Sequence, residues 1–156
     1  MLKGALSQLR GLSGPRRRAG TGAGTGRIRL PLPPALSASL GCDAVGVPAR
    51  YGFRLLSHLP RTGCVFADAD RWWWIVPAGS DLELHWPEQV SYAAGACVPA
   101  VRPRLIHAPD SRTPYTPPIP LFLMVCQVIG VAPSWSPSWA AARSGLGQES
   151  VQGSVR

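Results

Sequence analysis

Apolar residues recur at helical spacing in two parts of the chain. In the first part, four apolar residues share one helical face: Tyr51, Leu55, Leu56 and Leu59. Pro48 suits the first turn of a helix and Pro60 ends it, so the pattern predicts a helix over 48–59. In the second part, a continuous apolar segment follows a proline-rich connector and predicts a helix over about 119–130.

Shorter apolar runs predict β-strands. Residues 64–67 and 72–76 flank the polar residues 68–70, and this arrangement predicts a β-hairpin. Because side chains alternate along a strand, Trp72, Trp74 and Val76 are expected on one face and Trp73 and Ile75 on the other. Further short strands are predicted over residues 82–84, 89–98 and 104–108.

These elements predict an α+β domain over residues 41–132, a small mixed sheet with one or two packed helices. A chain of 156 residues has room for one such core. Residues 1–40 are rich in Gly, Pro and Arg and are predicted to be a disordered basic arm. Residues 133–156 are predicted to be a flexible tail.

The arm carries most of the net charge of +8. Residues 1–29 contain seven basic side chains and no acid, among them Arg16, Arg17, Arg18, Arg27 and Arg29. One hypothesis is that they contact nucleic-acid phosphates without sequence preference. An alternative is a mitochondrial transit peptide, because leucines share one face of a possible helix before residue 10.

The sequence predicts a cytoplasmic protein without a membrane anchor. No secretory hydrophobic region is present, and the longest apolar run, 119–132, is shorter than the roughly 20 residues that cross a bilayer. The four cysteines are scattered without paired spacing and are interpreted as reduced thiols. The oligomeric state stays open.

The pair Asp68 and Asp70 follows an apolar strand, as carboxylates do in some divalent-metal sites. The favoured interpretation is a hairpin tip, since Asp is a preferred turn residue and a strongly β-prone run begins two residues later. The three histidines lack metal-ligand spacing, and neither a cofactor nor a catalytic residue is predicted.

The tryptophan-rich strand allows two interpretations. Trp72 and Trp74, with Arg71 beside them, would form an aromatic face able to stack bases of a nucleic acid. Alternatively, the indoles fill the core, because basic side chains are not interleaved along the strand. The core interpretation is favoured, and the three residues are kept as nucleic-acid-binding candidates.

Three segments, in order, resemble the N-terminal domain of bifunctional DNA primase-polymerases. They are residues 42–48 (CDAVGVP) with the helix after them, 71–79 (RWWWIVPAG) and 105–111 (LIHAPDS). The resemblance covers roughly residues 41–111, a stretch over which small actinobacterial proteins of unassigned function are also similar.

The resemblance implies nucleotidyl transfer with two metal ions, but this chain departs from the family pattern. Asp43 matches the first metal-binding carboxylate, Val45 stands at the second, and Trp72 replaces a nucleotide-contacting histidine. Holding two metal ions requires several carboxylates. We therefore expect a degenerate, non-catalytic module that binds nucleic acid or nucleotide. The alternatives are an active metal-dependent transferase using Asp43 or the Asp68/Asp70 pair, and a mitochondrial matrix protein.

Overall fold

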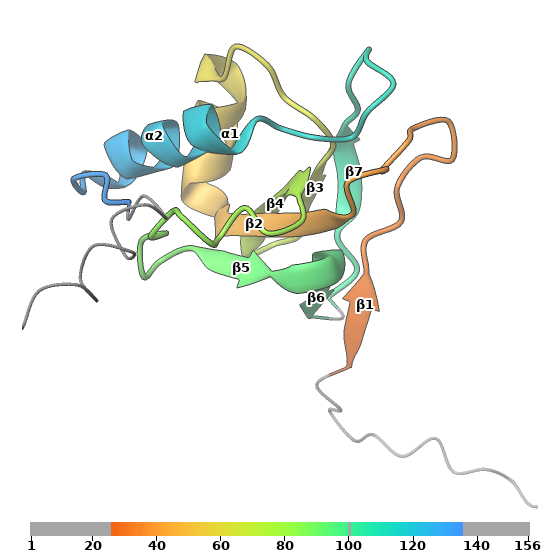
Figure 1. Cartoon of the computed structure of the whole chain (residues 1–156). Helices are drawn as coiled ribbons and strands as arrows, with labels where there is room; N and C mark the ends of the chain where they lie inside the picture. Colours follow the sequence, from red (N-terminus) through yellow and green to blue (C-terminus); the bar gives the residue numbers. More distant parts are fainter. Residues whose placement is uncertain (1–25, 100, 136–156) are drawn as a thin grey trace, which may run out of the picture.

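A computed structural model describes residues 26–99 and 101–135 of the chain. In this part of the chain, a five-stranded sheet and a two-stranded ribbon are combined with two α-helices (Figure 1). The predicted α+β class is therefore confirmed. Every described strand pair is antiparallel, whereas a mixed sheet was expected from the sequence.

The five-stranded sheet has the strand order β5-β2-β4-β3-β7, and the ribbon pairs β1 with β6. The strands are β1 Arg27–Arg29, β2 Cys42–Pro48, β3 Val65–Ala67, β4 Arg71–Pro77, β5 Ser91–Ala93, β6 Cys97–Pro99 and β7 Arg104–His107. The helices are α1 Ala49–His58, α2 Pro118–Ile129 and the short 3-10 helix η1 Ala94–Ala96.

Strand β4 lies at the centre of the sheet and forms the predicted hairpin with β3. Its full length pairs with β2, from Arg71 opposite Pro48 to Pro77 opposite Cys42. Both neighbours of β4 are thus antiparallel to it, and the tryptophans are placed in the middle of the domain.

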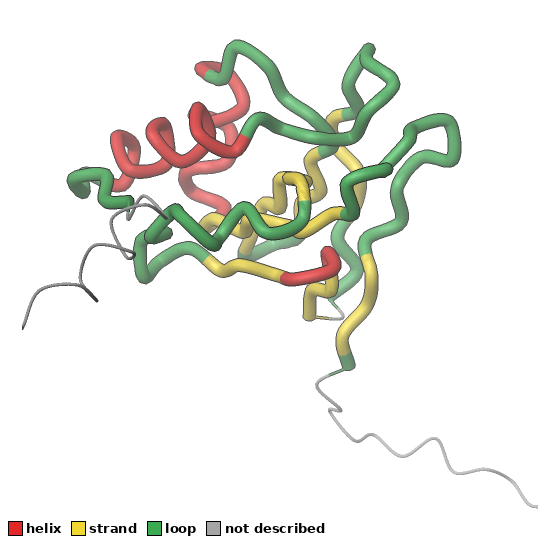
Figure 2. The backbone as a smooth tube through the Cα atoms, in the orientation of Figure 1, coloured by secondary structure: helices red, strands yellow, loops and turns green. Residues whose placement is uncertain are grey.

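The two faces of the sheet are covered by different parts of the chain. Helices α1 and α2 lie on one face of the sheet (Figure 2). Apolar residues of both helices pack there against those of the strands. We call this the helix face; its buried residues are Val45, Val47, Leu55, Leu59, Val65, Trp74, Val76, Leu121 and Val125. The opposite face, which we call the arm face, includes Phe66, Trp73 and Ile75 and is covered by Leu30, Val98 and their neighbours.

The domain begins before residue 41, so the predicted boundary of the arm is wrong. Leu30 is only 3% exposed and its N–H donates to the carbonyl of Ala96 at 3.0 Å. Leu32 and Leu36 pack on the same arm face. Residues 30–36 therefore cover the arm face, as the two helices cover the helix face. Residues 1–25 lie outside the described residues.

Some of the short strands predicted from the sequence are also wrong. Residues 82–84 form no strand, although Leu84 makes an isolated bridge with Trp135. The stretch 89–98 is divided between β5, η1 and β6 at Gly95, whose φ of 64° breaks the extended run.

The predicted tail boundary is early by at least a few residues. The Trp135 ring lies 6.4 Å from the ring of Phe122 on α2, so residues 133–135 still contact the domain. The rest of the tail, 136–156, lies outside the described residues. Within the described part, neither helix has the length and apolar character needed to cross a membrane.

The contact between α1 and β4 yields a stability prediction. A Cβ at Gly52 would lie 2.2 Å from the ring of Trp72, so Gly52→Ala should lower the free energy of unfolding by about 1–3 kcal/mol. Helix propensity alone would raise it by up to about 1 kcal/mol. Chemical denaturation distinguishes the two signs. Phe53→Ala, which truncates an exposed neighbour, is the control and should change little; a stabilised Gly52→Ala variant would contradict the packing described above.

Candidate functional site: an arginine-lined pocket

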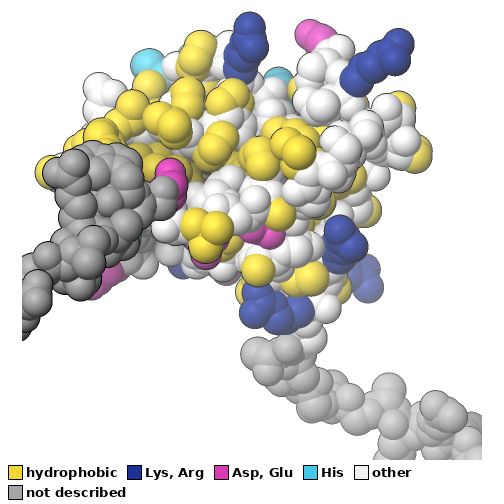
Figure 3. Space-filling model, viewed as in Figure 1, with side chains coloured by type: hydrophobic (Ala, Val, Ile, Leu, Met, Phe, Trp, Pro, Cys, Tyr) yellow, Lys and Arg dark blue, Asp and Glu magenta, His cyan; other side chains and the backbone are white. Residues whose placement is uncertain are grey.

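A pocket of about 370 Å³ on the arm face brings together arginines that are far apart in the sequence. Arg27 comes from β1, Arg71 begins β4, and Ser91 and Ala93 belong to β5. Figure 3 shows basic side chains gathered where the described structure begins, beside β1. The residues lining the pocket are Gly26, Arg27, Arg71, Trp73, Ser91, Tyr92, Ala93 and Pro99.

The alternation of β4 places Arg71 on the arm face together with Trp73. Trp73 is opposite Gly46 of β2, and a Cβ at Gly46 would lie 2.5 Å from its ring. The glycine therefore allows the indole to lie flat against the sheet. Trp73, which is only 2% exposed, thus lines the same pocket as Arg71.

Both guanidinium groups are fixed by backbone carbonyls. Arg27 donates from Nε and Nη2 to the Cys97 carbonyl at 3.2 and 2.6 Å. Arg71 donates from Nη1 to the carbonyls of Gly46 and Gln89, at 3.3 and 3.1 Å. Carbonyls orient these cations without neutralising them, and in the described part of the chain neither guanidinium forms an ion pair. Each guanidinium has five N–H groups, so donors remain for an anion.

Asp68 is used to form the turn of the hairpin. Its Oδ1 accepts the backbone N–H groups of Asp70 and Arg71, both at 2.8 Å, and its Oδ2 accepts the indole N–H of Trp73 at 3.3 Å. This is an Asx turn, in which the carboxylate satisfies backbone donors. The hairpin interpretation of Asp68 and Asp70 agrees with this geometry.

Asp43 is buried, and its carboxylate also accepts hydrogen bonds from within the protein. Its Oδ2 accepts the Gly79 N–H at 2.8 Å and the Tyr92 hydroxyl at 2.5 Å, and its Oδ1 accepts the Gly95 N–H at 2.7 Å. Burial by itself would raise the pKa of Asp43, but the bonds donated by Tyr92, Gly79 and Gly95 outweigh it and lower the pKa. Asp43 thereby ties three separate segments together as a carboxylate.

The three candidate aspartates do not converge. Asp43 lies opposite Val76 near one end of the β2–β4 pair, whereas Asp68 and Asp70 precede the opposite end, at Arg71. Within residues 26–99 and 101–135, no group of three or more His, Cys, Asp and Glu side chains has the proximity needed to hold a metal ion. Two-metal chemistry requires such convergence.

The aromatic face proposed for base stacking is covered by the helices. Trp74 is fully buried, and Trp72 lies against Gly52 of α1. Both indoles belong to the helix face, on the side opposite the arginine-lined pocket. This packing agrees with the favoured core interpretation and contradicts a stacking role for the buried Trp74 ring; the tryptophan that lines the pocket is Trp73.

Two of the nucleic-acid-binding candidates predicted from the sequence thus line the same pocket, and the others do not. Arg27 and Arg71 line one pocket, and Arg29 is exposed nearby on β1. Arg16, Arg17 and Arg18 lie outside the described residues. Trp73 and Ser91 were missed, although strand alternation already placed Trp73 on the same face as Arg71.

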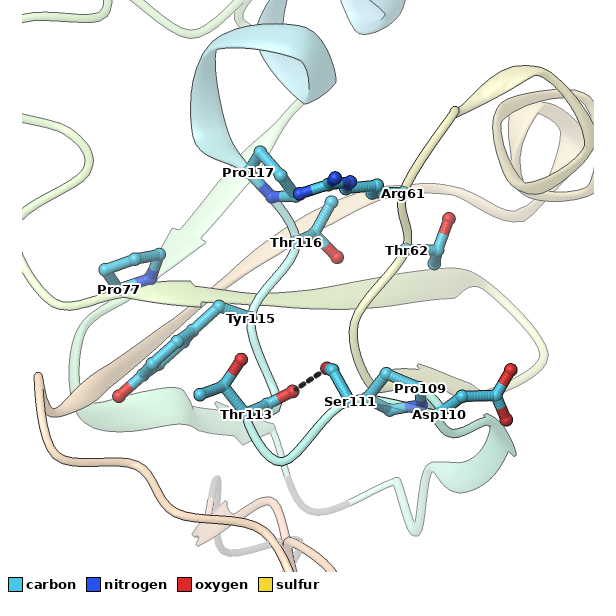
Figure 4. A pocket seen from close by; sticks show the side chains of 10 residues that line it. All are labelled: Arg61, Thr62, Pro77, Pro109, Asp110, Ser111, Thr113, Tyr115, Thr116 and Pro117. Atoms are coloured by element: carbon cyan, nitrogen blue, oxygen red, sulfur yellow. Dashed lines mark hydrogen bonds between the residues drawn. The ribbon is translucent and has the colours of Figure 1, made fainter.

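A larger pocket, of about 480 Å³, has a different chemical character (Figure 4). Arg61 and Asp110 both line it, so opposite charges are present. Its buried Thr116 hydroxyl accepts the Gly63 N–H at 2.9 Å, and its Ser111 hydroxyl donates to the Thr113 carbonyl at 3.0 Å. These internal bonds leave fewer groups for a ligand, so the arginine-lined pocket is the stronger candidate for anions.

Nucleophilic chemistry is disfavoured at Cys64 and Cys126. Cys42, Cys64 and Cys126 are buried free thiols, and Cys97 is half-buried. Burial raises the pKa of Cys64 to about 11 and also raises that of Cys126. A thiol must ionise to act as a nucleophile, so these environments suit structural cysteines.

Comparison with protein families, curated proteins and solved structures finds no match for this chain. The resemblance to primase-polymerases consequently stays a prediction from the sequence. The assignment of function rests on the geometry of the described residues.

The network around Asp43 predicts acid-sensitive stability. Because the folded-state pKa of Asp43 is lowered, its contribution is present above its unfolded pKa and is lost as pH falls below about 4. Asp43→Asn should lower the free energy of unfolding by about 2–4 kcal/mol at pH 7 and reduce this acid dependence. Denaturant titration from pH 7 to pH 3 measures both effects.

Asp70→Asn is the matched control for this prediction, because Asp70 is exposed at the hairpin tip. It should change the free energy of unfolding by less than about 0.5 kcal/mol. Equal stability of Asp43→Asn and wild type at pH 7 would show that the carboxylate network does not stabilise the fold.

Proposed function

We propose that this chain is a non-catalytic module that binds nucleic acid through phosphate contacts at the arginine-lined pocket. The observation that carries the proposal is the pairing of Arg27 and Arg71 in one pocket, each oriented by backbone carbonyls and neither neutralised by a described carboxylate. Guanidinium groups match the geometry of phosphate oxygens and keep their charge at all physiological pH values.

Nucleic acid is favoured over a small anion because further basic residues lie close to Arg27 in the sequence. Arg29 is exposed two residues after Arg27, and residues 1–25 add five basic side chains and no acid. A polymer with regularly spaced phosphates can contact many of these cations at once, whereas an isolated anion cannot. Phosphate contacts carry no direct sequence information, so little sequence preference is expected.

The absence of catalysis is proposed because two of the candidate metal-binding carboxylates already accept hydrogen bonds within the protein. Asp43 and Asp68 each accept three hydrogen bonds from the protein, and binding a metal ion would require breaking some of them. Val45 stands where the primase-polymerase pattern has its second carboxylate. The protein is thus proposed to keep a phosphate-binding role without nucleotidyl transfer.

The proposal is tested by the salt dependence of binding to fluorescein-labelled oligothymidine. The double variant Arg27→Gln/Arg71→Gln should weaken binding by about tenfold or more at low salt. Because two phosphate contacts are lost, the slope of log affinity against log salt should decrease by about 1.4 for a single strand. Fluorescence anisotropy of the full chain measures both quantities.

The control for this experiment is Arg54→Gln. Arg54 is exposed on α1, the helix that covers the opposite face of the sheet, so its loss should leave the salt slope nearly unchanged. Circular dichroism confirms that the double variant is folded. If folded double variant and wild type bind oligothymidine equally, the pocket is not the phosphate site; if wild type does not bind at low salt, the proposed function is wrong.

A further inference from the structure

Strand β7 forms an open edge of the five-stranded sheet. It pairs with β3 on one side, and no described strand pairs with its other side. In an antiparallel sheet, an edge strand directs unpaired N–H and C=O groups outward, where another extended segment can bind them. This edge is the far end of the sheet from β5, and β5 contributes to the arginine-lined pocket.

Two adjacent apolar side chains on β7 are left partly uncovered. Leu105 is 40% exposed and Ile106 is 41% exposed. Leu105 lies opposite Phe66, whose side chain is in the arm-face core, so Leu105 extends that apolar layer to its edge. The register shifts between the pairs at Val65 and Phe66, which leaves Ile106 as the bulged residue. A further strand would complete the apolar layer.

The positive charge at the start of β7 indicates which kind of segment this edge would bind. Arg102 and Arg104 are both exposed, and Arg102 has a φ of 50°, a left-handed conformation that costs a non-glycine residue free energy. Pairing of two copies of this chain through β7 would offer Arg104 no carboxylate on the facing strand, because β7 (RLIH) contains none. An extended segment with acidic side chains is attracted instead.

We propose that the β7 edge binds an extended peptide segment in which acidic side chains alternate with apolar ones. The segment adds to the sheet as a sixth strand next to β7. Its backbone satisfies the outward groups of β7, its apolar side chains cover Leu105 and Ile106, and its carboxylates lie near Arg102 and Arg104. This surface is separate from the phosphate-binding pocket, so it does not depend on the proposed function.

The test uses a short acetylated peptide of alternating valine and glutamate as the probe. Titration of the full chain should show saturable binding, and hydrogen exchange should slow within residues 104–107 but stay unchanged in α2. The same peptide with N-methylated backbone amides should not bind, because methylation removes the donors that pair with a strand. The double variant Arg102→Glu/Arg104→Glu should bind the probe at least about fivefold more weakly.

Arg54→Glu is the matched control, since it reverses an exposed charge on α1, and it should bind the probe like wild type. The proposal is overturned if the probe does not bind up to millimolar concentration, or if N-methylation leaves its affinity unchanged. It is also overturned if oligothymidine displaces the probe from β7. A free protein that sediments as a dimer with residues 104–107 already protected would assign the edge to a second copy.

Discussion

The antiparallel pairing of β2 with β4 is the constraint on which the rest of this domain depends. It fixes which side chains of the tryptophan-rich strand face the helices and which face the arm segment. A shift of one residue would exchange the two faces and bury Arg71 beneath the helices. The close approach of Gly46 to Trp73 and of Gly52 to Trp72 allows this register, because a side chain at either glycine would collide with an indole ring.

The acidic and basic residues around this strand pair have different roles. Two of the carboxylates considered as metal ligands are used as internal hydrogen-bond acceptors: Asp43 near one end of the β2–β4 pair, and Asp68 in the hairpin that leads into the other end. Arg27 and Arg71 are oriented by carbonyl groups that leave their charge available. In the described residues, the two arginines are oriented without being neutralised and these carboxylates are already hydrogen-bonded, and this arrangement supports the proposed phosphate binding without nucleotidyl transfer.

Local patterns in the sequence predicted the first helix, the β3–β4 hairpin and the alternation of the tryptophans, because each depends on neighbouring residues. Long-range contacts were not predictable in this way. The burial of Leu30 depends on a sheet face that distant strands create, and a proline-rich segment gives no local signal of that contact. The same reason explains the site: Arg71 was identified, but its meeting with Arg27 requires the β1–β6 ribbon. The packing of Trp72 and Trp74 agrees with the favoured core interpretation; they were also kept as stacking candidates because the cover of each face was unknown.

We propose that phosphates bind at the Arg27–Arg71 pocket, on the face of the sheet that carries Trp73. Indole N–H resonances in two-dimensional NMR test it directly, because Trp73 lines the pocket while Trp72 and Trp74 lie on the helix face. Titration with oligothymidine at low salt should shift the Trp73 indole and the Arg71 Nε–H signals and leave the Trp74 indole in place. Shifts confined to the Trp72 and Trp74 indoles, with Trp73 and Arg71 unchanged, would show that phosphates do not bind at this pocket.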